Sequence, residues 1–385
     1  MINEKRLIDN YLEMIRIKSI SGNEKNLADY IYKKLSSLGL EPRYVYYDEE
    51  KKESPCVIAE IKGKELGPTL LMIGHIDTVD VANGWETNPF EPVIEGDKVY
   101  ALGAMDMKGG LSCILETAEY IVENNIELKG NLVLAFACDE EVLSRGTYKM
   151  IQEGLKADMA IMAECRFEDA AVGFRGRYSI EVNVKGKTGH ASKYPYVGEN
   201  AIIKASKLAV AIESLGTKTH EYLGEGTWCI RYIEGGYQKT LSVPDHCYLF
   251  VDRYVVPGED FAYCKMQIEE AAENLGMKED VEIQLKERPL PYMDAFSIPQ
   301  DHEIVKIVSK NYKEVVGKEL GYAYDKSVCD SNFLVTVANI PTITFGPSGG
   351  NMHAANEYGY VSQIKHAAKI YIKTVEDILM RIEKC

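Results

Sequence analysis

His75 and Asp77 stand at the end of the apolar run 69–76. Side chains two residues apart on a strand point to the same face, so we expect these two to share one face. A metal-bound histidine commonly donates its other ring N–H to a carboxylate or carbonyl, and Asp77 is a candidate for orienting the site from behind. Taken alone, the His-x-Asp pattern favours a structural pair.

Asp106 lies in the glycine-rich segment GAMDMKGG, residues 103–110, directly before a predicted helix. A carboxylate in such a turn can be held by backbone N–H groups, or it can bridge two cations. An aspartate that caps the helix is the simpler alternative. The segment therefore predicts either a helix cap or a bridging ligand.

Three further acidic residues and one histidine also follow apolar runs. Glu140 and Glu141 are adjacent at a strand end and point to different sides, so one can bind a metal while the other acts as a general base. Glu164 follows the apolar run 158–163, and His353 follows the glycine-rich segment GPSGGN.

Each of these signals is weak alone, but together they predict one site. Two histidines and several carboxylates fall at the carboxyl ends of strands in one predicted sheet. Mixed histidine and carboxylate ligands suit zinc, cobalt or manganese, and they exclude a thiolate-rich structural zinc site. A bridging carboxylate with one histidine and one glutamate on each side is the composition of a two-metal hydrolase.

The elements that must position these residues alternate between strands and helices over the first ~175 residues, which predicts an α/β catalytic domain with a central, mostly parallel sheet. Residues 4–19 have helical periodicity, and Ser21 to Glu24 form a predicted capping box for a second helix. The pattern of residues 109–123 predicts an amphipathic helix. Predicted strands cover 56–61, 69–76 and 131–138. Ligands of open α/β sheets bind at the carboxyl ends of the strands.

A different pattern interrupts this domain and predicts a smaller α+β domain of four strands and two helices. The predicted strands are 178–185, 227–233, 247–255 and 281–286, and the helices are 200–214 and 259–272. The α/β pattern then returns with a helix at 302–315, a strand at 340–345 and a helix at about 361–383. We therefore predict domain segments 1–176, 177–288 and 289–385.

Composition limits the class of protein. The 385 residues are 46% hydrophobic and 27% charged, which excludes a mainly disordered chain, and a net charge of −15 argues against nucleic acid as a partner. No apolar run reaches the ~20 residues of a membrane span, and the charged start lacks a secretory signal. The nine cysteines are odd in number and include no CxxC, so we expect reduced thiols in a cytoplasmic protein.

At this point the sequence resembles the zinc-dependent exopeptidase and deacylase family of acetylornithine deacetylase, succinyl-diaminopimelate desuccinylase, aminoacylase and glutamate carboxypeptidase. The resemblance covers nearly the whole chain and rests on the motifs GHIDTV, GAMDMKGG, DEE, AEC, GHAS, VDRYVVPGE and FGPSGGNMHAANE. It implies that two divalent metal ions, expected to be zinc with cobalt or manganese as alternatives, are bridged by Asp106. The remaining implied ligands are His75 and Glu164 for one ion, and Glu141 and His353 for the other. Glu140 would be the general base, with Asp77 orienting His75.

The same resemblance implies that the inserted domain is a lid that also forms a homodimer interface. His190 in GHAS would reach a neighbouring active site and polarise the scissile carbonyl. Arg253 would bind a substrate carboxylate as a bidentate fork, although a structural salt bridge is the alternative. The loop Gly346–Gly350, with Gly349 and Gly350, would offer backbone N–H donors to the substrate.

The implied activity is hydrolysis of the amide bond of an N-acyl amino acid or a C-terminal amino acid, by a metal-activated water and a glutamate base. Two alternatives stay open, namely a dipeptidase or aminopeptidase of the same family and a catalytically silent binding protein on the same fold. Leu102 and Leu241 stand where the family usually has arginine and asparagine. The sequence does not say which substrate follows from these differences.

Overall fold

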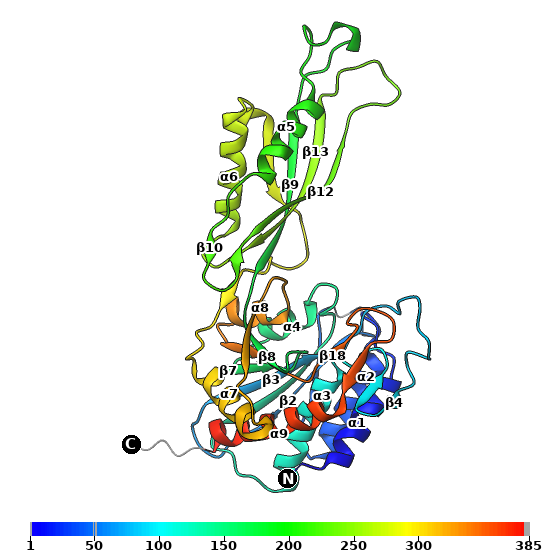
Figure 1. Ribbon diagram of the computed structural model, residues 1–385, viewed down its shortest axis with the longest axis vertical. Coiled ribbons are helices and arrows are strands. Elements are labelled where there is room, and N and C mark those ends of the chain that lie inside the picture. The colour runs from blue at the N-terminus through cyan, green and yellow to red at the C-terminus, as the bar shows by residue number, and fades with distance from the viewer. Residues whose placement is uncertain (1, 49, 51, 381–385) are drawn as a thin grey trace. The chain divides into compact units, whose positions relative to one another are not determined.

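The computed structural model describes residues 2–48, 50 and 52–380 (Figure 1). The chain divides into two compact units. Unit 1 comprises Met1–Val172, Ile298–Ala323 and Cys329–Cys385, and unit 2 comprises Gly173–Ser297 and Tyr324–Val328. Unit 2 thus takes up a second, short segment of the chain, at 324–328, which the sequence pattern did not predict.

The central sheet of the structure is mixed. Its order is β1 (Arg43–Tyr46), β2 (Pro55–Ile61), β6 (Asn131–Ala137), β3 (Thr69–His75), β7 (Met159–Met162), β17 (Thr342–Thr344), β8 (Asp169–Phe174) and β15 (Phe296–Ser297), with β16 (Gly321–Asp325) beside β8. The neighbours from β6 to β17 are parallel, whereas β1, β2, β8 and β15 pair antiparallel. The predicted mostly parallel sheet is therefore wrong at its edges. One reason is the short link between β1 and β2, which permits only an antiparallel pair.

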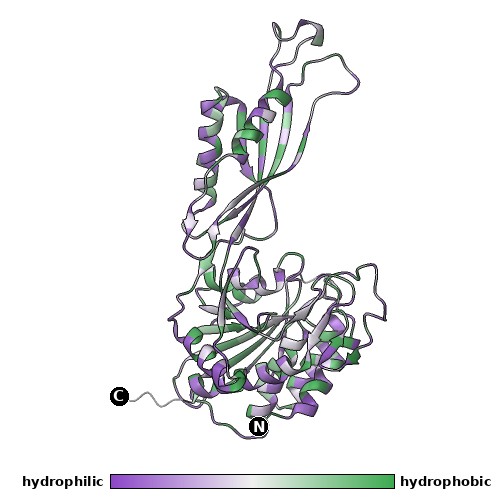
Figure 2. Cartoon of the chain, viewed as in Figure 1, coloured by the Kyte–Doolittle hydropathy of each residue, from purple (hydrophilic) through white to green (hydrophobic). Residues whose placement is uncertain are grey.

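Helices cover both faces of this sheet in unit 1 (Figure 1). They are α1 (Glu4–Arg16), α2 (Lys25–Ser37), α3 (Lys108–Glu123), α4 (Arg145–Gln152), α7 (Glu303–Val316), α8 (Asp330–Thr336) and α9 (Val361–Leu379). On one face α1, α3 and α9 contact one another, and α3 and α9 contact β3. On the other face α4 and α8 contact each other. The central strands are hence buried on both sides, which explains their continuous apolar runs (Figure 2).

Helix α3 matches the predicted helix in position but is not amphipathic, because nearly all of its side chains are buried. It lies in the middle of its layer, between α1 and α9 and against the sheet. A Cβ atom at Gly110 would lie 2.0 Å from the carbonyl oxygen of Ala163, so only glycine permits this approach of α3 to the end of β7. The approach brings the start of α3 beside Glu164.

A small antiparallel sheet joins two loops of the candidate site. Its order is β18 (Gly349–Gly350), β19 (Tyr358–Tyr360), β5 (Lys98–Tyr100) and β4 (Val93–Glu95). Strand β19 follows the loop that carries His353, and β5 precedes the loop that carries Asp106. Pairing of β19 with β5 therefore holds these two distant segments of sequence side by side.

Unit 2 contains the predicted four-stranded sheet, whose strand pairs are all antiparallel in the structure. Its order is β12 (Thr227–Gly235), β13 (His246–Val255), β9 (Gly176–Lys185) and β14 (Val281–Leu285), accompanied by α5 (Ala201–Glu213), α6 (Phe261–Asn274) and the short pair β10 (Thr219–His220) and β11 (Gly224–Glu225). On β13, Cys247, Leu249 and Val251 are buried and alternate with less buried residues. These residues and apolar side chains of α5 and α6 form one core.

The predicted capping box before α2 is wrong. Helix α2 begins at Lys25, and its N-cap residue Glu24 makes no side-chain capping hydrogen bond. The hydroxyl of Ser21 instead donates to Oδ2 of Asp77 at 2.7 Å. A long-range carboxylate thus replaces the local backbone N–H as the partner of Ser21.

The eight cysteines in the described part of the chain are free thiols, and all except Cys229 are buried. This agrees with the predicted reduced state, while the ninth, Cys385, lies outside the described residues. Among the described helices, none combines the length and apolar character that a membrane crossing needs.

Candidate metal centre

The carboxyl ends of the parallel strands carry the candidate ligands of unit 1. His75 is the last residue of β3, Glu141 follows β6 and Glu164 follows β7. Asp106 comes from the loop before α3, and His353 from the loop between β18 and β19. Because β6, β3 and β7 are parallel, their ends meet at one edge of the sheet.

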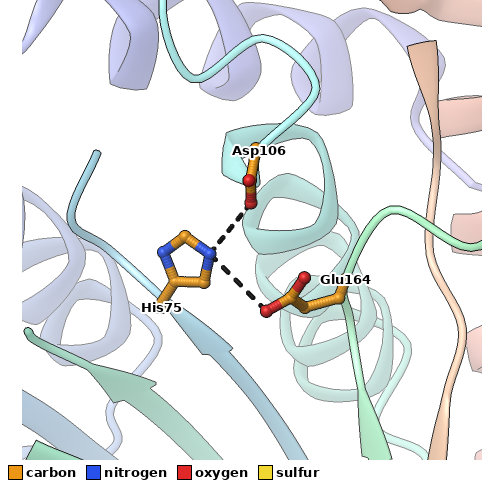
Figure 3. A group of neighbouring side chains, drawn as sticks. All are labelled: His75, Asp106 and Glu164. Carbon is orange, nitrogen blue, oxygen red and sulfur yellow. Dashed lines mark hydrogen bonds and ion pairs between the residues drawn. The ribbon is translucent and has the colours of Figure 1, made fainter. Parts of the chain in front are cut away.

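The first cluster consists of His75, Asp106 and Glu164, which point toward one another (Figure 3). Nε2 of His75 lies 3.0 Å from Oδ1 of Asp106 and 3.7 Å from Oε1 of Glu164. The imidazole is buried, with an exposed fraction of 1%. One potential ligand atom from each residue lies within 4.8 Å of the others.

The position of the ring proton on His75 favours binding of a cation by this cluster. Its Nδ1 lies 3.0 Å from the carbonyl oxygen of Asp77, and a carbonyl can only accept, so Nδ1 carries the proton and donates it. In the neutral ring Nε2 then directs a lone pair toward two carboxylates. A metal ion resolves this repulsion, as does a second proton on the ring. The donor set therefore fits a divalent cation.

The second cluster shares Asp106 with the first and adds Glu141 and His353. Nε2 of His353 lies 3.2 Å from Oδ2 of Asp106 and 3.1 Å from Oε2 of Glu141. The two oxygens of Asp106 thus face different histidines. This is the arrangement of a carboxylate that bridges two cations.

The electrostatics of the centre also require positive charge. Burial and, second to it, the charge of Asp106 raise the pKa of Glu164 to about 8. Burial likewise raises the pKa of Glu140 well above its usual range, with Glu164 as the second cause. Hydrogen bonds to Asp106 and Glu141 raise the pKa of His353 to about 10. Carboxylates outnumber histidines here, and cations would favour their charged forms.

Asp77 contacts more of the centre than the sequence predicted. Its two carboxylate oxygens accept the backbone N–H groups of Glu140 and Glu141, each at 3.1 Å. Its Oδ1 also lies 3.5 Å from Nδ1 of His75. One buried carboxylate therefore orients both the histidine and the two adjacent glutamates.

Two buried carboxylates near the centre were not identified as functional from the sequence. Asp330, at the start of α8, accepts a hydrogen bond from the hydroxyl of Thr147 at 2.6 Å. Glu357 accepts backbone N–H groups of the loop that carries Asp106. The spacing of Glu357 after His353 was visible, but no local pattern showed that its partners lie about 250 residues away.

The remaining predicted site residues of unit 2 differ in their surroundings. His190 is exposed, and its Nδ1 accepts hydrogen bonds from the backbone N–H and the hydroxyl of Ser192. Arg253 is fully buried in an ion pair with the equally buried Glu259, and it also donates to the carbonyl of Tyr254. Within the described residues Arg253 thus forms the structural ion pair that was the alternative, and its role as a carboxylate fork stays a prediction.

Gly349 and Gly350 form the short strand β18 and do not lie in a free loop. They pair with Gly359 and Tyr358 of β19. The backbone groups that face β19 are committed to this sheet. Any N–H donor for a substrate would have to come from the opposite edge of β18.

The model of a family described as peptidase family M20/M25/M40 matches residues 71–377. Succinyl-diaminopimelate desuccinylase of Nitrosomonas eutropha is 25% identical over 381 residues, which cover 96% of this chain and 97% of that protein.

Solved structures show the same fold. A tripeptidase from Staphylococcus aureus matches with a TM-score of 0.79 at 23% identity, covering 99% of this chain and 100% of that one. A dinuclear metal binding peptidase from Bacillus subtilis matches with a TM-score of 0.76 at 18% identity, covering 98% and 99% of the two chains.

Proposed function

Because the chain belongs to peptidase family M20/M25/M40 and is therefore a metal-dependent hydrolase, we propose that it cleaves the amide bond of an N-acyl amino acid or a C-terminal amino acid with two divalent ions. One observation carries the proposal. The two oxygens of Asp106 face Nε2 of His75 and Nε2 of His353, so one carboxylate joins two clusters of ligands.

In this proposal His75, Asp106 and Glu164 hold one ion, and Asp106, Glu141 and His353 hold the other. The ligands suit zinc, with cobalt or manganese as alternatives. When bound, the ions supply Lewis acidity, which lowers the pKa of water and stabilises negative charge on the substrate. The dinuclear peptidase with the same fold supports a pair of ions.

Glu140 is the proposed general base. Its backbone is fixed by Asp77, next to the ligand Glu141, and its half-buried carboxyl group has a raised affinity for a proton. Glu140 takes the proton from the attacking water and delivers it to the leaving amine. Its raised pKa suits both steps, since the group must accept a proton and then release it.

His190 is proposed to donate a hydrogen bond to the carbonyl oxygen of the substrate. Because its Nδ1 accepts from Ser192, the neutral ring carries its proton on Nε2. That N–H group is a donor of the kind that stabilises an oxyanion. Arg253 has no part in the proposal, since it is paired with Glu259.

Neighbouring substitutions test the assignment of base and ligand. We expect Glu140→Gln to retain two zinc ions and to lose hydrolysis by about 10²–10⁴-fold, the usual contribution of a general base. The matched variant Glu141→Gln should instead bind the second ion more weakly, because it removes a charged ligand. Zinc content by atomic absorption and initial rates are measured on both proteins. An unchanged rate for Glu140→Gln would sink the mechanism.

The substrate class is tested with N-succinyl and N-acetyl amino acids beside dipeptides and tripeptides, using metal-stripped protein refilled with zinc or cobalt. We expect cleavage of the N-acyl amino acids, consistent with a desuccinylase relative. Faster cleavage of peptides with a free amine would favour the peptidase alternative, as in the tripeptidase of the same fold. Metal binding without any turnover would favour a silent binding protein.

A further inference from the structure

Glu357 holds the backbone of the loop that carries Asp106. Its Oε1 accepts the N–H groups of Met105 at 2.8 Å and Asp106 at 3.0 Å, and its Oε2 accepts that of Gly103 at 3.1 Å. The side chain is buried, with an exposed fraction of 2%. A carboxylate with this many charge-assisted bonds fixes the direction of the loop.

The loop needs such support because its backbone is unusual. Gly103 has a φ of +78°, and a Cβ atom there would lie 2.9 Å from Cγ2 of Thr78. The N–H group of Ala104 donates to the carbonyl oxygen of Ala101 at 3.2 Å, whereas those of Gly103, Met105 and Asp106 turn toward one point, and no helix or strand supplies acceptors for these three. The carboxylate of Glu357 satisfies them together.

Glu357 also belongs to the loop of His353, a ligand of the second cluster. It lies four residues after His353, and its carbonyl oxygen accepts the N–H group of Ala101 at 3.0 Å. The next residues, Tyr358–Tyr360, form β19, which pairs with β5 just before the Asp106 loop. The two loops are thus joined through both the backbone and the side chain of one residue.

The surroundings of Glu357 argue against a simple buried salt bridge. Lys108 is the nearby cation that acts on its charge, but Nζ of Lys108 donates to the carbonyl oxygen of Ile17. Within the part of the chain that the structure describes, the Glu357 carboxylate accepts its hydrogen bonds from backbone N–H groups. The partner of Glu357 is therefore the ligand loop itself.

We propose that Glu357 is a positioning residue of the metal centre, which fixes Asp106 relative to His353 and thereby sets the affinity for the second ion. The inference rests on the proposed two-metal function, in which the second ion is held by Asp106, Glu141 and His353. Glu357 itself touches neither ion nor substrate. It acts on the site only through the backbone that presents Asp106.

Zinc titration of the metal-stripped full-length protein against a chromophoric chelator tests the proposal. We expect Glu357→Ala to weaken the second zinc ion by about 10–100-fold, the usual effect of losing an outer partner of a metal site, and to weaken the first ion less. Glu357→Gln should give a smaller loss. Its amide oxygen can still accept from Met105 and Asp106, but its NH₂ group would then face the N–H of Gly103.

Glu116→Gln is the matched control. Glu116 is also a buried carboxylate that accepts a backbone N–H group, that of Asn3 at 2.7 Å, but it lies farther along α3 and binds Arg6. It should lower stability without changing the affinity for the second ion. Equal zinc affinities in wild type and Glu357→Ala would overturn the proposal, as would the same loss in Glu116→Gln.

Hydrogen exchange of the metal-free protein gives a readout that does not depend on zinc. We expect the amides of Gly103, Met105 and Asp106 to be protected in the wild type and to exchange faster in Glu357→Ala, with the amides of β6 unchanged. Fast exchange of these three amides in the wild type would overturn the role of Glu357. A wild type that binds a single ion but shows this protection would overturn the two-metal function, and with it the effect on a second ion, while the positioning of the Asp106 loop by Glu357 would stand.

Discussion

At the scale of single residues, the candidate centre shows that a buried side chain is ionised only when neighbouring groups stabilise its charge. Asp106, His75 and Glu164 are brought together where water is largely excluded, and each carboxylate raises the proton affinity of its neighbours. Burial opposes charge on Asp106 as well, but hydrogen bonds to His353 and His75 hold the pKa of Asp106 below its usual range, whereas Glu164 needs further positive charge to be ionised. Because buried carboxylates need nearby positive charge to be ionised, the centre favours the binding of cations.

Arg253 is a buried charge whose partner is another side chain of the protein. Its guanidinium pairs with the buried Glu259 and lies 4.6 Å from the ring centroid of Trp228. We expect Arg253→Met to destabilise the protein by about 3–5 kcal/mol, because it leaves Glu259 charged, buried and unpaired. Urea unfolding followed by tryptophan fluorescence measures the change.

The double variant Arg253→Met with Glu259→Gln is the control for this prediction, and it should recover part of the lost stability because the orphaned charge is gone. The alternative role, a fork for a substrate carboxylate, predicts a different pattern. In that case Arg253→Met would raise KM for N-acyl amino acids while the urea midpoint stayed constant.

At the scale of elements, the packing of α3 against β7 determines where two ligands lie. Asp106 precedes α3 and Glu164 follows β7, so the distance between helix and strand sets the distance between them. Gly110 permits this contact, since a Cβ there would lie 2.0 Å from the carbonyl oxygen of Ala163. Glycine at position 110 has a lower helix propensity than alanine, but it allows α3 to approach the end of β7 closely.

We expect Gly110→Ala to destabilise the protein by about 2 kcal/mol or more, although alanine in a helix is normally better than glycine by about 1 kcal/mol. The first zinc ion, held by His75, Asp106 and Glu164, should also bind more weakly. Thermal unfolding and zinc titration are the measurements. Gly109→Ala is the matched control, because its Cβ would meet Cγ of Pro347 at 3.2 Å and needs only a small adjustment. A stabilised Gly110→Ala would contradict the packing argument.

At the scale of the whole molecule, unit 2 carries an unpaired sheet edge. Strand β12 pairs with β13 on one side and is largely exposed along its length, including Tyr232 and Ile233 at 50% and 48% exposure. Long exposed edge strands with apolar side chains commonly pair with another chain. This feature supports the proposed homodimer.

We expect light scattering to give twice the chain mass of 43.2 kDa, and Ile233→Lys to give a monomer with reduced activity, because His190 is proposed to act on the neighbouring active site. Met266→Lys on α6 is the control, since Met266 is similarly exposed but lies on a helix away from the sheet edge. A fully active monomer would refute the role of His190 in the partner's site.

Local pattern alone located most of the elements of both units. The apolar runs that became β2, β3 and β6 and the alternating strands of unit 2 were predictable because hydrophobic periodicity is a property of neighbouring residues. The same reasoning marked the candidate ligands, since each stands at the end of an apolar strand or beside a glycine-rich turn, but their assignment to two ions came from the family resemblance. Their residue types limited the chemistry to divalent cations.

Only the tertiary structure decided which partner each polar side chain has. Ser21 binds Asp77 instead of capping α2, Arg253 is sealed by Glu259, and Glu357 supports a loop about 250 residues away. The sheet is mixed at its edges for the same reason, because strand order depends on which segments meet in space. Such contacts form when distant segments of the chain meet in space. Hydrophobic periodicity describes only neighbouring residues, so these contacts cannot be predicted from it.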